Sequence, residues 1–308
     1  MNAFRVGAWL ATTFLAVTAC ATAGAGSPPA VAEGCAASSG AQVLPLVELY
    51  TSEGCSSCPP ADRWLGEQVA RAPTAASYLA FHVDYWDDLG WPDRFASAAH
   101  SVRQRARVRA AGDNRVYTPQ VMVGSDVNAR WSDRAAWQSR LASHGKPAPI
   151  ALAVSTQSAA TWHVAVAPVG DRAFPDLARV WLAHYQDGQV TQVRSGENRG
   201  RRLRHDRVVT RLDGPWALGK ASAPRAWHAA RDPEAGGVVA FVQTADGEVL
   251  QSVTLDAGDC AHSWRAVGDA GSSRPGNAGA AASRSGSPMA SASGDPVHLP
   301  AGAGTSGR

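Results

Sequence analysis

The sequence predicts an α/β half followed by a β-rich half, and three observations support this. Between residues 43 and 145, buried apolar runs alternate with segments of helical spacing in the order strand, helix, strand, helix, strand, helix. From residue 150 the apolar residues recur every second position, and turn signals such as QDG and ADG separate the runs. From residue 266 to 308 the chain is rich in Ala, Gly, Ser and Pro, which predicts a disordered tail.

The composition describes a globular protein with little net charge. Of the 308 residues, 45% are hydrophobic and 18% are charged, and the formal net charge is +3. The arginines at 103, 105, 107 and 109 are two residues apart, so on a helix they would wind around the axis without forming a stripe. We therefore expect no nucleic-acid partner.

The amino terminus has the features of an export signal. Arg5 precedes the short apolar segment VGAWLATTFLAVTA, which is too short to span a bilayer comfortably. Cys20 follows it directly, as in a lipobox, so we expect a signal peptide over residues 1–20 and lipidation at Cys20; cleavage after Ala23 is the alternative. The protein is then expected in the periplasm or cell envelope, attached to the membrane only through its lipid, with residues 21–41 as a tether.

Each element of the first half follows from local pattern. Strands are expected over 43–50 and 77–86 and in VYTPQVMVGS. Helices are expected over 59–72, 92–114 and 132–144, and Ser132 is expected to be the N-cap of the third helix. In the middle helix Phe95, Ala99, Val102 and Ala106 share one face, which is expected to point inward. We expect a first domain over 42–147 and a β-rich, sandwich-like domain over 148–265.

Five cysteines need an assignment in an exported chain. Cys20 is used by lipidation or removed with the signal, and Cys55 and Cys58 are neighbours. Cys35 and Cys260 flank the expected folded body. We therefore hypothesise a structural disulfide between them, which would close a very long loop and contribute about 4–5 kcal/mol in the chain-entropy model.

The Cys-Ser-Ser-Cys motif lies between an expected strand and an expected helix, which is the thioredoxin-type context. Peptide dipoles at a helix start stabilise a thiolate, and two intervening residues let one sulfur reach the other. Cys55 is expected to be the more exposed sulfur and to attack a substrate disulfide, after which Cys58 resolves the mixed disulfide. Pro59 or Pro60 should begin the helix, which leaves both cysteines just ahead of it.

Three further residues are candidates for the same site. Thr118 and Pro119 open the third strand, where thioredoxin-like folds place a cis-proline against the cysteine pair. Glu48 is an acid in an apolar strand, so burial could raise its pKa and let it take the proton of Cys58. The alternative is that its side chain reaches solvent at the end of the strand.

Metal binding and a structural role are the rival interpretations of the pair. Cys55 and Cys58 are half of a metal site, and His82, His100 and Met122 could join them in a copper(I) site. His82 lies on an apolar strand, where a core histidine is more common, and His100 is expected on a helix surface. The pair could also be a structural staple. No motif for another cofactor occurs, so we expect none.

Residues 82–95 combine four aspartates with two tryptophans. Their spacing does not match a calcium-binding loop. The aromatic residues are expected to line a shallow groove near the cysteines.

Five separated motifs resemble one exported bacterial family, catalogued as domain of unknown function 1223 and placed among thioredoxin-like proteins. They are VELYTSEGCSSCPPAD, HVDYWDDLGW, RQ at 103–104, VYTPQVMVGS, and SGENRG followed by VV. The resemblance covers residues 43 to 260 and implies a thioredoxin-like first half with a β-rich extension. It also implies a site at Cys55, Cys58, Thr118 and Pro119.

The sequence thus favours an exported thiol–disulfide oxidoreductase that acts on protein thiols or disulfides of the envelope, with a redox partner that resets it. Two alternatives stay open: a copper(I)-handling protein, and a non-enzymatic binding module with a structural disulfide.

Overall fold

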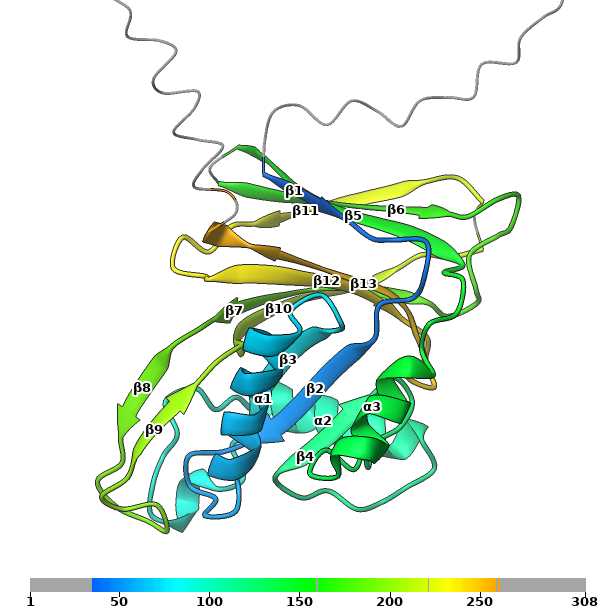
Figure 1. Ribbon diagram of the computed structural model, residues 1–308. Coiled ribbons are helices and arrows are strands. Elements are labelled where there is room, and N and C mark those ends of the chain that lie inside the picture. The colour runs from blue at the N-terminus through cyan, green and yellow to red at the C-terminus, as the bar shows by residue number, and fades with distance from the viewer. Residues whose placement is uncertain (1–34, 159, 221, 259, 261–308) are drawn as a thin grey trace, which may run out of the picture.

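The computed structural model describes residues 35–158, 160–220, 222–258 and 260 (Figure 1). The expected signal peptide, Cys20 and the expected tail over 266–308 lie outside these residues. Within them, no helix is long and apolar enough to cross a membrane.

The structure is a mixed α/β fold in which strands form a seven-stranded and a four-stranded sheet. The larger sheet has the order β13-β12-β7-β10-β3-β2-β4 and the smaller one β1-β5-β6-β11, while β8 and β9 form a separate hairpin. The strands are β1 (Ala36–Ser38), β2 (Leu46–Thr51), β3 (Ser77–His82), β4 (Gln120–Val123), β5 (Ile150–Ser158), β6 (Thr161–Pro168), β7 (Arg179–Gln186), β8 (Gln189–Gln192), β9 (Arg202–His205), β10 (Val208–Ala217), β11 (Arg225–Ala230), β12 (Gly237–Gln243) and β13 (Val249–Asp256).

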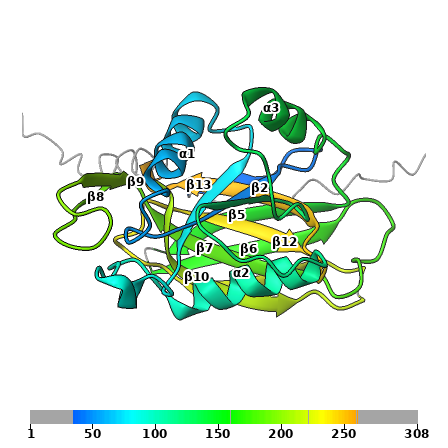
Figure 2. The same ribbon diagram turned by 90° about the horizontal axis from the view of Figure 1, so that it is seen from below.

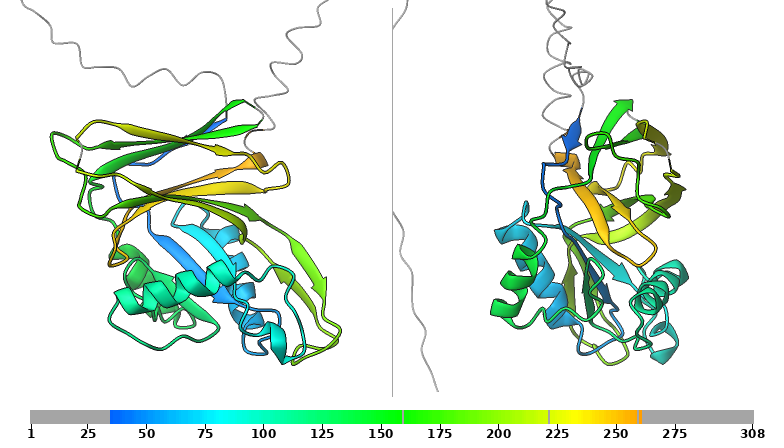
Figure 3. Two further views of the ribbon diagram at one scale, coloured as in Figure 1. Left: turned by 180° about the vertical axis from the view of Figure 1, so that it is seen from behind. Right: turned by 90° about the vertical axis from the view of Figure 1, so that its right-hand side faces the viewer.

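Helices cover both faces of the β3-β2-β4 end of the large sheet. Helices α1 (Pro59–Arg71) and α3 (Arg134–Ala142) lie on one face and α2 (Ala98–Ala110) on the other (Figures 2 and 3). Because side chains alternate along a strand, Val47 and Leu49 of β2 pack toward α1 and α3, whereas Leu46 and Tyr50 face the α2 side.

The β7-β12-β13 end of the large sheet packs against the small sheet as a sandwich. Its core includes Trp162 and Val164 of β6, with Leu182 of β7 and Ala240 of β12. The large sheet is nevertheless continuous, because Val208 of β10 pairs in parallel with Ala80 of β3. The sheet therefore takes strands from both expected domains, and the boundary at 147/148 stays a prediction.

A disulfide joins the two ends of the described chain. Cys35 and Cys260 are bonded across 225 residues with their Cα atoms 4.7 Å apart, which is the pairing that the cysteine arithmetic favours. The expectation that residues up to 41 form a tether is wrong for Ala36–Ser38. These residues, held beside the disulfide, pair with β5 as strand β1.

The expected inward face of α2 is also wrong. Val102 is 60% exposed, and the helix buries Arg103, Gln104 and Arg107 instead. Arg103 and Arg107 are four residues apart and therefore share one face, so this pair does form a stripe. His100, expected on the surface, is buried too, and its Nδ1 lies 2.9 Å from the His82 carbonyl oxygen. Burial lowers the pKa of His100 to about 4.

The arginines of α2 can be buried because Glu48 of β2 lies opposite them and its carboxylate pairs with both guanidinium groups. Arg103 Nε donates to Glu48 Oε1 at 2.8 Å, and Arg107 Nε donates to Glu48 Oε2 at 3.0 Å. Arg103 also donates to Gln243 of β12 at 3.1 Å, so the cluster ties α2 to both ends of the sheet. For α3 the cap is Asp133 and not Ser132, since the Asp133 side chain accepts from the backbone N–H of Ala136.

Replacing the buried carboxylate should destabilise the fold strongly. Glu48→Gln leaves two buried guanidinium groups without a counter-charge, and breaking such a pair typically costs about 3–5 kcal/mol of unfolding free energy. Glu67→Gln removes an exposed i, i+4 pair with Arg71 and should cost less than about 1 kcal/mol. Urea unfolding of both variants measures the difference; equal losses would contradict a special role of the buried cluster.

Candidate functional site

The cysteine pair lies in the loop between β2 and α1. Cys55 and Cys58 form a disulfide with Cα atoms 5.4 Å apart. The α-helix begins at Pro59, directly after Cys58, so both cysteines lie just ahead of it as the proline pair predicts. The loop turns tightly, since the N–H of Cys58 donates to the carbonyl of Cys55 at 3.2 Å.

The expectation that Cys55 is the more exposed sulfur is wrong. Both cysteines have 0% exposure, although Ser56 and Ser57 between them are exposed. Residues 195–199, at the tip of the β8–β9 hairpin, are hydrogen-bonded to the cysteine loop and are called the covering loop from here on. The Asn198 amide donates to the carbonyls of Glu53 at 2.8 Å and Cys55 at 2.9 Å, and the N–H of Ser56 donates to Glu197 at 3.0 Å.

The peptide bond between Thr118 and Pro119 is cis and lies beside the cysteine loop. Gln120, the next residue, pairs with Tyr50 near the end of β2, so Pro119 lies beside the point where β2 leads into the loop. Trp86 connects the two segments. Its Nε1 donates to the Thr118 hydroxyl at 2.8 Å, and a Cβ added at Gly54 would lie only 3.2 Å from the Trp86 Cβ.

The expectation of a raised pKa for Glu48 is wrong. Burial alone would raise it, but the guanidinium groups of Arg103 and Arg107 outweigh burial and lower the pKa of Glu48. Glu48 also points to the α2 side of the sheet, whereas α1, which Cys58 precedes, packs on the other face. The carboxylate is therefore held ionised in a structural cluster and is badly placed to accept a proton from Cys58.

A different acid, Asp62, lies one helical turn from Cys58, and its backbone N–H donates to the Cys58 carbonyl at 3.1 Å. It is four residues after Cys58 in the first turn of α1, so the two side chains are neighbours on one helix face. Burial raises the pKa of Asp62, and its Oδ1 accepts a hydrogen bond from the Thr51 hydroxyl at 2.8 Å. Its other oxygen lies 3.7 Å from His205 Nδ1.

His205 links two buried carboxyl groups. Its Nε2 lies 3.3 Å from Glu53 Oε1, so the imidazole lies between Asp62 and Glu53. The other Glu53 oxygen accepts from Trp91 Nε1 at 2.9 Å, and Glu53 lines a groove at the surface. A chain of titratable groups thus runs from Asp62, one helical turn after Cys58, through His205 to Glu53 at that groove. Trp91 lines the groove as the sequence predicts, whereas Trp86 is not among its lining residues.

His82 is held by Asp93, consistent with a core histidine. Its Nδ1 lies 2.6 Å from Asp93 Oδ2, which also accepts from the N–H of Glu53 at 2.8 Å. Burial would raise the pKa of Asp93, but the neighbouring imidazole outweighs it and holds that pKa at about 2. In the part of the chain that the structure describes, no group of three or more His, Cys, Asp or Glu side chains is arranged to hold a metal ion.

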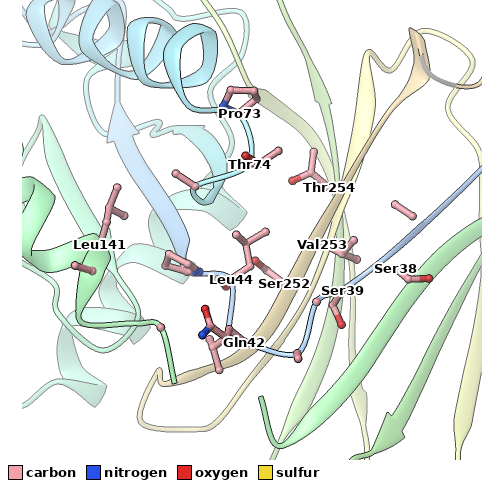
Figure 4. A pocket seen from close by; sticks show the side chains of 18 residues that line it. Ser38, Ser39, Gln42, Leu44, Pro73, Thr74, Leu141, Ser252, Val253 and Thr254 are labelled. Atoms are coloured by element: carbon pink, nitrogen blue, oxygen red, sulfur yellow. The ribbon is translucent and has the colours of Figure 1, made fainter. Parts of the chain in front are cut away.

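A cavity of 890 Å³ lies at the other end of β2, away from the cysteines (Figure 4). Residues such as Gln42, Leu44, Pro73 and Val253 line it, and none of its lining residues is charged. The groove beside Glu53 is therefore the better candidate for chemistry.

Sequence reasoning missed Asp62, His205 and Asn198. Asp62 had a local signal, because a carboxyl four residues after the second cysteine shares its helix face. Asn198 lies within the quoted SGENRG motif, but its contact with a loop more than 140 residues earlier carries no local signal.

Comparison with known proteins gives a family and two solved structures. The protein AGR_C_4864 from Agrobacterium tumefaciens is 27% identical with a TM-score of 0.54, over 70% of this chain and 94% of that one. HBP35 of Porphyromonas gingivalis is 13% identical with a TM-score of 0.52, over 71% and 76%, a likeness of fold alone. No curated protein matches the sequence. The family model described as protein of unknown function (DUF1223) matches residues 46–243, and the chain therefore belongs to this family.

Proposed function

We propose that this protein is a thiol–disulfide oxidoreductase with a thioredoxin-like domain, and that Cys55 and Cys58 are its redox pair. The observation that carries the proposal is a disulfide between cysteines three residues apart, set between the end of β2 and the start of α1, one helical turn before the buried Asp62. Thr118 and Pro119, which lie beside the loop and are connected to it through Trp86, support the same assignment. Peptide dipoles at the start of α1 favour a thiolate there.

The proposed reaction exchanges two electrons with a protein substrate. In the reducing direction the Cys55 thiolate attacks a substrate disulfide, which forms a mixed disulfide and releases one substrate thiolate. Cys58 then loses its proton and attacks the Cys55 sulfur, which closes the Cys55–Cys58 disulfide and releases the second substrate thiolate. The substrate sulfurs take up two protons, and a redox partner returns the pair to the dithiol. The opposite direction follows the same steps in reverse.

In this proposal Asp62, and not Glu48, accepts the proton of Cys58. Its raised pKa and its place one helical turn from Cys58 suit a group that accepts the proton of the resolving thiol. His205 and Glu53 continue the path toward the surface, which such a buried pair needs because both sulfurs lack contact with solvent.

The covering loop has to move in each cycle. With 0% exposure, neither sulfur can meet a protein disulfide until the hydrogen bonds from Asn198 and to Glu197 open. These bonds set part of the barrier to exchange, since each contributes a net free energy of about 0.5–1.5 kcal/mol.

Export and lipid anchoring belong to the same proposal. They rest on the amino-terminal sequence ending at Cys20, and the Cys35–Cys260 disulfide suits an oxidising compartment such as the periplasm. The partners would be envelope proteins with thiols or disulfides. Membrane fractionation of Cys20→Ser tests the anchor: the variant should leave the membrane fraction, and retention there would refute lipidation at Cys20.

The cysteine variants test the reaction directly. Cys55→Ser should abolish insulin reduction by dithiothreitol-recycled protein, and Cys58→Ser should accumulate a mixed disulfide visible on a non-reducing gel, because the resolving thiol is missing. The reduction potential of the wild-type pair should lie above about −300 mV, the range of structural disulfides. Full activity in Cys55→Ser, or a potential below that range, would refute the redox role.

Asp62→Asn should change the pH dependence of the reaction. Only the ionised carboxylate accepts a proton, so the wild-type rate of reaction of the reduced protein with glutathione disulfide should rise as pH increases through the raised pKa of Asp62. The Asn variant should be at least about tenfold slower and should lack this rise. Asp246→Asn, an exposed loop aspartate, is the control and should match the wild type. An unchanged profile in Asp62→Asn would exclude the carboxyl from the proton transfer.

Asn198→Ala should speed the reduction of the disulfide. Losing two hydrogen bonds to the cysteine loop removes about 1–3 kcal/mol that holds the covering loop closed, so dithiothreitol should reduce the pair at least about fivefold faster. Asn128→Ala, whose side chain bonds Asp113 and Tyr117, serves as the matched control. A rate unaffected by Asn198→Ala would show that the loop does not limit access.

A further inference from the structure

The hairpin that covers the cysteine pair is strongly basic. Residues 189–205 contain five arginines and a single carboxylate, Glu197, in a chain with a net charge of only +3. Arg204 pairs with Asp206. The other four arginines are exposed, and in the described part of the chain none of these four forms an ion pair with a carboxylate. The four are Arg194, Arg199, Arg201 and Arg202. The Glu197 carboxylate is turned to the backbone of Ser56.

A groove of 410 Å³ runs between this hairpin and residues 91–94. Trp91, Pro92 and Val190 give it apolar lining, while the exposed Arg94 and Arg194 line its two sides. Arg94 also connects the two sides, since its guanidinium group donates to the carbonyl of Val190 at 3.3 Å.

The groove lies close to the cysteine loop. Glu53, which lines it, is two residues before Cys55, and its carboxylate is occupied by Trp91 and His205. The same hairpin carries the covering loop: Asn198 bonds the cysteine loop, and the Ser195 hydroxyl donates to the carbonyl of Gly90 at 2.6 Å. A chain bound in the groove would thus contact the element that must move to uncover the sulfurs.

We propose that this groove binds an acidic segment of the substrate next to its reactive cysteine, so that the substrate class is proteins with carboxylates flanking the disulfide or thiol. The inference rests on the proposed oxidoreductase function and deepens it. Arginine pairs with carboxylates through two parallel hydrogen bonds, and unpaired exposed arginines beside a cleft raise the encounter rate of an anionic partner.

An anionic membrane surface is the rival occupant, since exposed arginines attract acidic lipids as well. A polypeptide fits better. Arg94 and Arg194 line a shallow groove with apolar side chains between them, and Glu53 in the same lining is two residues from the proposed redox pair, which needs a sulfur-bearing substrate.

The test uses three peptides that differ only in charge. Each has one central cysteine joined to 2-thiopyridine as a mixed disulfide and flanked by Glu, Gln or Lys residues. The thiolate of the reduced protein attacks the peptide sulfur and releases 2-thiopyridone, whose absorbance gives the rate. The Glu peptide should react at least about tenfold faster than the Lys peptide at low ionic strength, and about 0.5 M salt should remove the difference.

Two charge-reversal variants locate the preference. Arg94→Glu with Arg194→Glu should reverse the order of the peptides. Arg109→Glu with Arg172→Glu, at exposed arginines on α2 and in the loop before β7, should keep the wild-type order. Circular dichroism checks that each variant is folded, and the Gln peptide gives the activity that does not depend on charge.

Each failure has a distinct meaning. Reaction of all three peptides at equal rates would overturn the acidic substrate class and leave the oxidoreductase intact. If the three peptide rates are equal and the protein binds vesicles containing an anionic phospholipid, with binding lost in Arg94→Glu with Arg194→Glu, the acidic substrate class is overturned in favour of a lipid surface. No reaction with any peptide would overturn the proposed function itself, and the inference would fall with it.

Discussion

Two hydrogen bonds from one side chain, the amide of Asn198, hold the cysteine loop in the state that the structure shows. They reach backbone carbonyls on both sides of Gly54, those of Glu53 and Cys55. Because the bonds are to the backbone, they fix the path of the loop whichever side chains it carries. With this contact in place the cysteine pair has no exposed surface. The proposed chemistry at the sulfurs therefore requires the cysteine loop or the hairpin to move.

The polar interior is divided by the alternation of strand β2. Glu48 points to the side of α2, where two arginines keep it ionised, and Thr51 bonds Asp62 on the side of α1. Both acids are buried, yet they differ in character, because one has two cationic partners and the other has a histidine and a hydroxyl. Burial alone therefore does not identify a proton acceptor; the charges that face the carboxyl do.

Much of this arrangement could be predicted from the sequence, and what could not has physical reasons. Local sequence pattern predicts the alternation of strands and helices and the strand–CxxC–helix order. The number and positions of the cysteines predict the Cys35–Cys260 pairing. The buried face of α2 does not, because periodicity analysis treats arginine as exposed and favours Val102. The predictions for Glu48 and His100 were wrong for a similar reason, since the groups that contact these side chains belong to other elements of the fold. His205 and Asn198 reach the site only through a tertiary contact with residues more than 120 positions earlier.

The continuous sheet explains how those distant residues arrive. β7 and β10 are antiparallel neighbours, and the β8–β9 hairpin connects them, with Gly188 and Arg207 N–H groups donating to Asp206 and Asp187 at the junction. Because β10 also lies beside β3, this long hairpin extends past the end of the sheet to the loop that follows β2 (Figure 1). The β-rich half thereby supplies the covering loop, His205 and one side of the groove, while the α/β half supplies the cysteines, Asp62 and the other side. A site divided in this way requires both halves, so a fragment ending near residue 147 would keep the cysteine motif but lose the groups that cover it and connect it to the surface.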